Sequence, residues 1–198
     1  MNKSKQKFLK NEPAIRIIGG RYGGRKLKYV GDPGTRPMKD RTREAVFNLI
    51  GTELKGKHVI DLFAGTGAMA FEALSRGAES ATLIERNFPM ARSIRENAEL
   101  LDVRDRIELV TGDVFAWAQR GPQLNESVRV VFCCPPYALF AERPDDVLHL
   151  LQGVQQEAAP GSLLVIEFDD RFSRDQLPAT ETWDCRSYAP AIIGIRRL

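Results

Sequence analysis

From residue 57 onwards, short apolar runs alternate with longer segments in which apolar side chains recur every three or four residues. Short apolar runs are typical of buried strands, and the longer recurrence is typical of helices that pack on them. The strand-like runs span residues 58–62, 81–85, 107–110, 128–133 and 162–168. The helical segments span residues 68–76, 89–101, 114–120 and 144–153. Alternation at this spacing predicts an α/β fold with a parallel sheet covered on both faces.

Both ends of the chain depart from this alternation. Residues 182–188 and 191–197 predict an antiparallel pair that closes the sheet. Near the other end, runs 14–18 and 25–30 flank the glycine-rich residues 19–24 and predict a β-hairpin with basic faces.

A helix is expected after this hairpin. Asp40 follows a turn-rich connector and is placed to cap it, with Val46, Phe47, Leu49 and Ile50 as its apolar face. The predicted organisation is a disordered basic tail, a hairpin-and-helix appendage and the main α/β domain, at residues 1–12, 13–56 and 57–198.

Charge is distributed unevenly along the chain. Residues 1–57 contain 15 Lys and Arg against 5 Asp and Glu, whereas residues 58–198 contain 14 Arg against 21 Asp and Glu. A basic block beside an acidic body indicates a contact surface for a polyanion such as nucleic acid, with a solubilising tail as the alternative for Lys3 to Lys10. The candidate phosphate contacts are Arg16, Arg21, Arg25, Lys26 and Arg36. We expect removal of residues 1–30 to abolish nucleic-acid binding and to leave the sheet folded.

Several classes of protein are disfavoured. Three cysteines, Cys133, Cys134 and Cys185, do not form a disulfide framework, and with two histidines they do not make a zinc site. No apolar run approaches the roughly 20 residues that span a bilayer. The Lys-rich N-terminal residues are not followed by the apolar region of a secretory signal. We expect a cytoplasmic monomer without a metal or a membrane partner.

The clearest chemical signal is the segment DLFAGTG at residues 61–67, directly after a strand and before a helix. Ligands of open α/β sheets bind at the carboxyl ends of the strands, where Gly65 and Gly67 would allow a close approach of the backbone. Glu85 ends the next strand and can accept hydrogen bonds from ribose hydroxyls, and Asp113 ends the third and can reach an adenine amino group. The predicted adenosine-binding residues are Asp61, Phe63, Ala64, Gly65, Gly67, Glu85, Arg86, Asp113 and Val114.

The same loop fits one variant of the dinucleotide fingerprint, with Gly65, Gly67 and Ala70, so a nicotinamide enzyme is an alternative. Asp61, four residues before Gly65, opposes it. An acid at this position suits the positively charged methionine part of S-adenosylmethionine better than a pyrophosphate.

A second motif ends the fourth strand, at Cys134, Pro135, Pro136 and Tyr137. Its spacing matches the polar-Pro-Pro-aromatic motif of amino-group methyltransferases. An exocyclic amine of a base is a poor nucleophile, and acceptors for its N–H bonds would localise its lone pair. Pro135 offers a carbonyl without a competing N–H, and Tyr137 can stack on the base. The alternative is a Pro-Pro turn after a core strand.

Together these motifs resemble the RsmD-type guanine-N2 methyltransferases of small-subunit ribosomal RNA. The matching segments are RIIGG (16–20), GRKL (24–27), TRP (35–37), DR (40–41), RE (43–44), FN (47–48), DLFAGTG (61–67), EALSR (72–76) and PPY (135–137). The resemblance implies a Rossmann-like sheet with a final antiparallel strand, S-adenosylmethionine as cofactor, and ribosomal RNA or a small-subunit assembly particle as partner. It also implies that the hairpin and residues 35–48 close over cofactor and RNA, and it adds Arg41 and Asn48 to the RNA contacts.

The chain departs from the family pattern at Cys134, where the family carries Asp. A thiol is a weak acceptor, although it is close in shape to the serine of related enzymes. Three alternatives remain beside an active RNA methyltransferase. They are a non-catalytic RNA-binding homologue, a methyltransferase of DNA or protein amines, and an enzyme in which Cys134 attacks a pyrimidine covalently.

Overall fold

The computed structural model describes residues 15–29, 37–121, 124 and 127–198, and within them one seven-stranded sheet forms the centre of the molecule. Its strands are β1 (His58–Asp61), β2 (Ser80–Glu85), β3 (Ile107–Thr111), β4 (Arg129–Cys133), β5 (Leu163–Asp169), β6 (Asp184–Tyr188) and β7 (Ala191–Arg197). Their order is β3-β2-β1-β4-β5-β7-β6. Strands β1 to β5 are parallel, and β7 pairs antiparallel with both β5 and β6. The predicted mostly parallel sheet with an antiparallel closing strand is confirmed.

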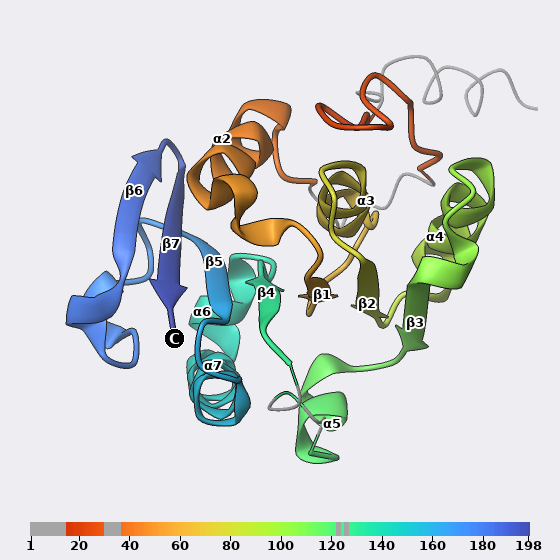
Figure 1. Ribbon diagram of the computed structural model, residues 1–198. Coiled ribbons are helices and arrows are strands. Elements are labelled where there is room, and N and C mark those ends of the chain that lie inside the picture. Colours follow the sequence, from red (N-terminus) through yellow and green to blue (C-terminus); the bar gives the residue numbers. More distant parts are fainter. Residues whose placement is uncertain (1–14, 30–36, 122–123, 125–126) are drawn as a thin grey trace, which may run out of the picture.

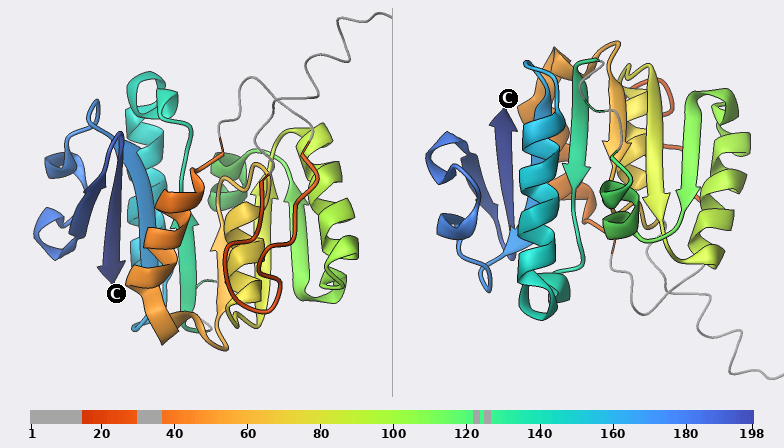
Figure 2. Two further views of the ribbon diagram at one scale, coloured as in Figure 1. Left: turned by 90° about the horizontal axis from the view of Figure 1, so that it is seen from above. Right: turned by 90° about the horizontal axis from the view of Figure 1, so that it is seen from below.

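Helices cover both faces of this sheet (Figures 1 and 2). On one face lie α2 (Asp40–Ile50), α3 (Ala68–Ser75) and α4 (Phe88–Leu100). On the other lie α5 (Val114–Gln119), α6 (Ala138–Glu142) and α7 (Pro144–Glu157). Short 3₁₀ helices span Gly51–Leu54, Arg104–Arg106, Arg174–Gln176 and Thr180–Thr182. Each face therefore has its own apolar core, as the continuous apolar runs of the central strands require.

Helix α2 differs from the prediction at its start. The residue before it is Lys39, which makes no side-chain cap, and Asp40 is already helical, so the prediction that Asp40 caps the helix is wrong. Its carboxylate instead accepts hydrogen bonds from Arg16 Nε and Arg43 Nη2, both at 3.0 Å. Two guanidiniums thus take the place of the backbone amides that a capping carboxylate would bind.

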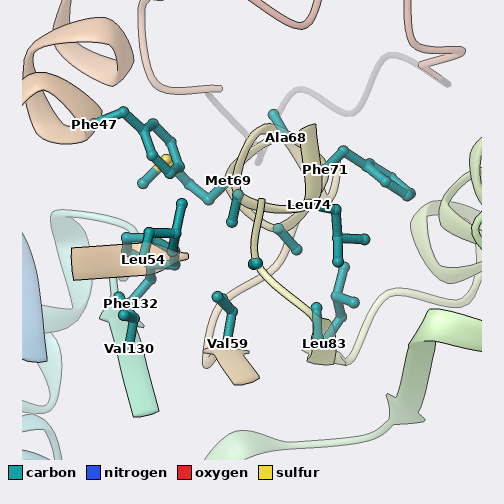
Figure 3. Close-up of a cluster of buried hydrophobic side chains, with 14 of the residues drawn as sticks. Phe47, Leu54, Val59, Ala68, Met69, Phe71, Leu74, Leu83, Val130 and Phe132 are labelled. Carbon is teal, nitrogen blue, oxygen red and sulfur yellow. The ribbon is translucent and has the colours of Figure 1, made fainter. Parts of the chain in front are cut away.

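The core under α2 joins the start of the chain to the sheet. Phe47 of α2 packs edge-on against Phe132 of β4, with ring centroids 5.6 Å apart. Figure 3 shows Phe47 beside Met69, between α2 and the strands. Ile15, Ile17, Tyr22 and Leu27 are buried in the same cluster.

Residues 15–29 contact the outer side of α3 and α4 (Figure 2). An isolated antiparallel bridge joins Arg16 to Lys26, and neither flanking run forms a strand in the described residues. The β-hairpin is therefore not confirmed, and the ends of its predicted runs, residues 14 and 30, lie outside the described residues. So does the predicted tail at residues 1–12.

Buried polar groups of α3 and α4 hold this segment in place. The fully buried carboxylate of Glu72 accepts hydrogen bonds from the backbone amides of Ile18 and Gly19, at 2.6 and 2.8 Å, and from Arg76 Nε at 2.7 Å. The buried Asn97 amide exchanges two hydrogen bonds with the backbone of Lys28. Removing the segment would leave a buried carboxylate without two of its donors, which is costly. The fold thus gives a reason against the expectation that residues 1–30 can be removed freely.

Two further expectations concern a membrane-spanning helix and a metal site. In the described part of the chain, no helix has the length and apolar character needed to cross a membrane. The same residues hold no cluster of three or more His, Cys, Asp or Glu side chains that suits a metal ion. The three cysteines are free thiols.

Candidate functional site

A cavity of about 430 Å³ lies at the carboxyl ends of the parallel strands. Most of the residues singled out in the sequence line it: Asp61, Phe63, Ala64, Gly65, Glu85, Arg86, Asp113, Val114, Cys134, Pro135, Pro136 and Tyr137. They reach it from four separate stretches of sequence because β1, β2, β3 and β4 are neighbours that end at the same edge of the sheet. The fold thus brings the two predicted constellations into one space.

Asp61, at the end of β1, is the most unusual group in this cavity. Its side chain is buried, with 1% exposed, and neither carboxylate oxygen accepts a hydrogen bond from the described residues. Burial and, secondly, the charge of Glu85 raise the pKa of Asp61 from 3.8 to about 7. The backbone amides of Phe63 and Ala70 oppose this shift without forming hydrogen bonds to the carboxylate. A buried carboxylate with free lone pairs suits a cationic or amine-bearing ligand.

Glu85, at the end of β2, is fixed by the loop that follows β1. Its Oε2 accepts a hydrogen bond from the Gly65 amide at 2.6 Å, and its Oε1 accepts one from the Asn87 amide at 2.7 Å. Burial raises the pKa of Glu85, and these amides partly oppose the shift. Each carboxylate oxygen has a further lone pair, so the oriented pair of oxygens can still accept two hydroxyl groups of a ligand.

The two glycines of the loop serve different needs. Gly65 lines the cavity and has a φ of +51°. Gly67 does not line it; it has a φ of +74° immediately before α3, and an added Cβ would lie 2.8 Å from Phe71 Cε2. The tight turn and the packing of α3 by themselves require a glycine at position 67, and its predicted contact with a ligand stays a prediction.

Asp113 follows β3 and is the N-cap of α5. Its Oδ1 accepts hydrogen bonds from the amides of Phe115 and Ala116, at 2.9 and 3.1 Å. Among the described residues Oδ2 accepts none, and the residue borders the cavity. Asp113 thus has a structural role in the cap while one oxygen remains available to a ligand.

The segment after β4 forms the opposite wall. Cys134 is half-buried, and burial, followed by the charges of Glu167 and Asp61, raises the pKa of its thiol well above the usual value. The neutral thiol opposes a covalent role, because the thiolate is the nucleophilic form. Tyr137 donates a hydrogen bond from its hydroxyl to Glu167 Oε1 at 2.7 Å.

Glu167, in β5, also lines the cavity and was not among the predicted site residues. The signal that could have identified it is an acid within the otherwise apolar run LLVIEF at 163–168, near the carboxyl end of β5. Burial raises the pKa of Glu167, and the bond from Tyr137 partly opposes the shift.

The start of α2 and the residues before it border the cavity on another side, through Pro37, Met38, Lys39, Thr42 and Arg43. Arg43 is 1% exposed and donates from Nη2 to the Arg16 carbonyl at 2.5 Å. This wall is therefore tied directly to the basic N-terminal segment.

None of the described RNA-contact candidates lines the cavity. Arg21, Arg25, Lys26, Arg41 and Asn48 are exposed, and Arg36 lies outside the described residues. Arg16 is 60% exposed and forms an ion pair with Asp40. The guanidiniums of Arg21 and Arg25 lie 5.5 and 5.7 Å from the centre of the Tyr22 ring.

Comparison with known proteins finds one matching family and several similar proteins. The family described as conserved hypothetical protein 95 matches residues 15–191. The chain is 33% identical, over 62% of its length, to the putative rRNA methyltransferase YlbH of Bacillus subtilis strain 168. It is 38% identical, also over 62% of its length, to ribosomal RNA small subunit methyltransferase D of Escherichia coli strain K12. These matches span 67% and 60% of the two relatives.

Solved structures agree with this placement over more of the chain. The putative methyltransferase yhhF of Escherichia coli superposes with a TM-score of 0.77 at 27% identity, over 93% of this chain and 98% of that one. A putative methylase from Haemophilus influenzae superposes with a TM-score of 0.70 at 25% identity over the same shares. The fold is the Rossmann-like methyltransferase fold.

Proposed function

This chain belongs to the family described as conserved hypothetical protein 95, and we propose that it transfers a methyl group from S-adenosylmethionine to the N2 amino group of a guanine in small-subunit ribosomal RNA. The relatives named as ribosomal RNA methyltransferases support the reaction and the class of substrate. The observation that carries the proposal is the single cavity at the strand ends, which holds both Asp61 and the segment 134–137.

The residues present fit this cofactor. The unpaired carboxylate of Asp61 is the acceptor for the positively charged methionine part, and it gains there the partner that the protein itself does not provide. Glu85 accepts the ribose hydroxyls, and Asp113 accepts the adenine amino group through Oδ2. When bound, S-adenosylmethionine supplies an electrophilic methyl group.

The wall formed by residues 134–137 receives the target base. The carbonyl of Pro135 accepts one N–H bond of the amine, and the Tyr137 ring stacks on the base. The exposed cations Arg21, Arg25, Lys26 and Arg41 contact the RNA backbone, and their separation from the cavity fits a substrate that extends well beyond one nucleotide. The partner is ribosomal RNA or a small-subunit assembly particle, which implies a cytoplasmic location.

A transfer assay tests this function. The purified chain is mixed with S-adenosylmethionine labelled in the methyl group and with small subunits from a strain that lacks this gene. We expect label in N2-methylguanosine of the RNA, and none with Asp61→Asn. The matched control is Asp105→Asn, at an exposed site before β3 and so at the opposite end of that strand from the cavity, which should retain the parent's activity. Label in DNA or protein, and none in RNA, would contradict the proposal.

A further inference from the structure

The pairing of β4 with β5 places an acid beside the motif that ends β4. The two strands are parallel, with Cys133 opposite Ile166, so the next residues along, Cys134 and Glu167, lie at the same level of the sheet. Both line the cavity, and the charge of Glu167 is among the causes that raise the pKa of the Cys134 thiol. A carboxylate is therefore present next to position 134, supplied by the neighbouring strand.

Glu167 is set up as an acceptor. Its Oε1 takes the hydrogen bond from the Tyr137 hydroxyl at 2.7 Å, and its Oε2 accepts none from the described residues. The other five residues of the run 163–168 are buried and apolar, so a carboxylate here carries a desolvation cost that packing alone does not explain.

We propose that Glu167 supplies the carboxylate that binds the target amine. For this role as acceptor, residue 134 of this chain offers only a thiol. This inference rests on the proposed methyl transfer to a base. An ionised carboxylate can only accept hydrogen bonds. Guanine presents two adjacent donors, N1–H and the N2 amino group, whereas adenine and cytosine present an acceptor beside their amino group. Glu167 thereby selects guanine.

The same carboxylate accepts the proton that the transfer releases. The bond from N2 to the methyl carbon forms as the bond from that carbon to sulfur breaks, and the electron pair of the broken bond stays on sulfur. The nitrogen then carries an extra positive charge and loses one proton. Glu167 accepts this proton and releases it to water.

The alternative is that Glu167 merely positions Tyr137, and two single variants separate the two roles. Glu167→Gln keeps the size and an acceptor for Tyr137 but replaces one acceptor with a donor. We expect kcat to fall about 100-fold or more, the usual effect of losing a general base, with S-adenosylmethionine affinity by calorimetry unchanged. The unfolding temperature should not fall, because the variant no longer carries the desolvation cost of the carboxylate. Tyr137→Phe removes the hydroxyl bond and leaves the carboxylate, so we expect a loss of kcat below about tenfold, because the carboxylate still accepts the amine and its proton.

A double variant tests whether a second carboxylate restores the activity lost in Glu167→Gln. In Glu167→Gln, the second change Cys134→Asp places a carboxylate on the neighbouring strand, and we expect it to restore kcat at least about tenfold. A Glu167→Gln variant as active as the parent would overturn the inference, and so would a Tyr137→Phe variant as impaired as Glu167→Gln. A parent that does not methylate RNA would overturn the proposed function together with this inference, whereas the other two results leave the proposed function intact.

Discussion

Replacing Asp61 by Asn should make the protein without cofactor more stable relative to the parent as the pH rises. In the folded chain the pKa of Asp61 is about 7, against 3.8 for the free side chain, because the carboxylate is buried and close to Glu85. The folded state therefore holds a proton that the unfolded state releases between these two pH values. It follows that this group lowers the free energy of unfolding as the pH rises through this window.

The magnitude follows from the two pKa values. Over each pH unit in which Asp61 is ionised in the unfolded chain but not in the folded one, the free energy of unfolding falls by about 1.36 kcal/mol. At pH 8 the penalty on the parent is about 4 kcal/mol, and at pH 5 it is about 2 kcal/mol. The asparagine side chain of the variant cannot ionise, so the stability of the variant minus that of the parent should increase by about 2 to 3 kcal/mol from pH 5 to pH 8. Any cost of burying the amide itself cancels in this comparison.

Urea unfolding followed by circular dichroism, without cofactor, measures the difference in stability between variant and parent at pH 5 and at pH 8. Asp105→Asn is the matched control, since it makes the same change of side chain at an exposed site. A pH-independent difference for Asp61→Asn would show that the Asp61 carboxylate is not held in an unfavourable environment, and the argument that it awaits a cationic ligand would fail.

Three further predictions concern the cofactor, the N-terminal segment and the motif after β4. Glu85→Ala should weaken S-adenosylmethionine binding in calorimetry by about 1–3 kcal/mol, and NAD should not bind to the parent; NAD binding in place of S-adenosylmethionine would refute the cofactor assignment. Removal of residues 1–29 should lower the urea midpoint as well as RNA affinity, because Glu72 loses two amide donors; an unchanged midpoint would contradict this role of the segment. Cys134→Ser should retain methylation activity within about tenfold, and Cys134→Asp should match or exceed the parent, because a carboxylate is the stronger acceptor; loss of activity in both would favour a covalent thiol.

The strands and helices could be predicted because a local sequence pattern marks each of them. Apolar runs that alternate with amphipathic segments indicate β1 to β5 and most of the helices within two or three residues. Helix α6 escaped prediction because it has five residues and directly follows Pro135, Pro136 and Tyr137, which indicate a turn. Asp113 and the cofactor loop were found because acids at successive strand ends meet at one edge of a parallel sheet.

The rest depends on contacts between segments far apart in the chain. Arg43 belongs to the basic stretch in the sequence, yet it is buried beside Glu72 of α3, with Nε 3.9 Å from Oε2. The place of Glu167 beside the motif after β4 follows from the pairing of β5 with β4, and strand order cannot be deduced from local composition. The assignment of residues 13–56 as a separate appendage stays a prediction, although Ile17 and Phe47 share one core with the sheet.

The central claim is that this chain methylates the N2 amino group of a guanine in small-subunit ribosomal RNA. Nucleoside mass spectrometry of that RNA, from cells with and without the gene, tests it most directly. The account predicts that one N2-methylguanosine disappears in the cells without the gene and returns when the parent gene is restored, but not when the Asp61→Asn variant is supplied. An unchanged amount of N2-methylguanosine, or the loss of a different methylated nucleoside, would contradict it.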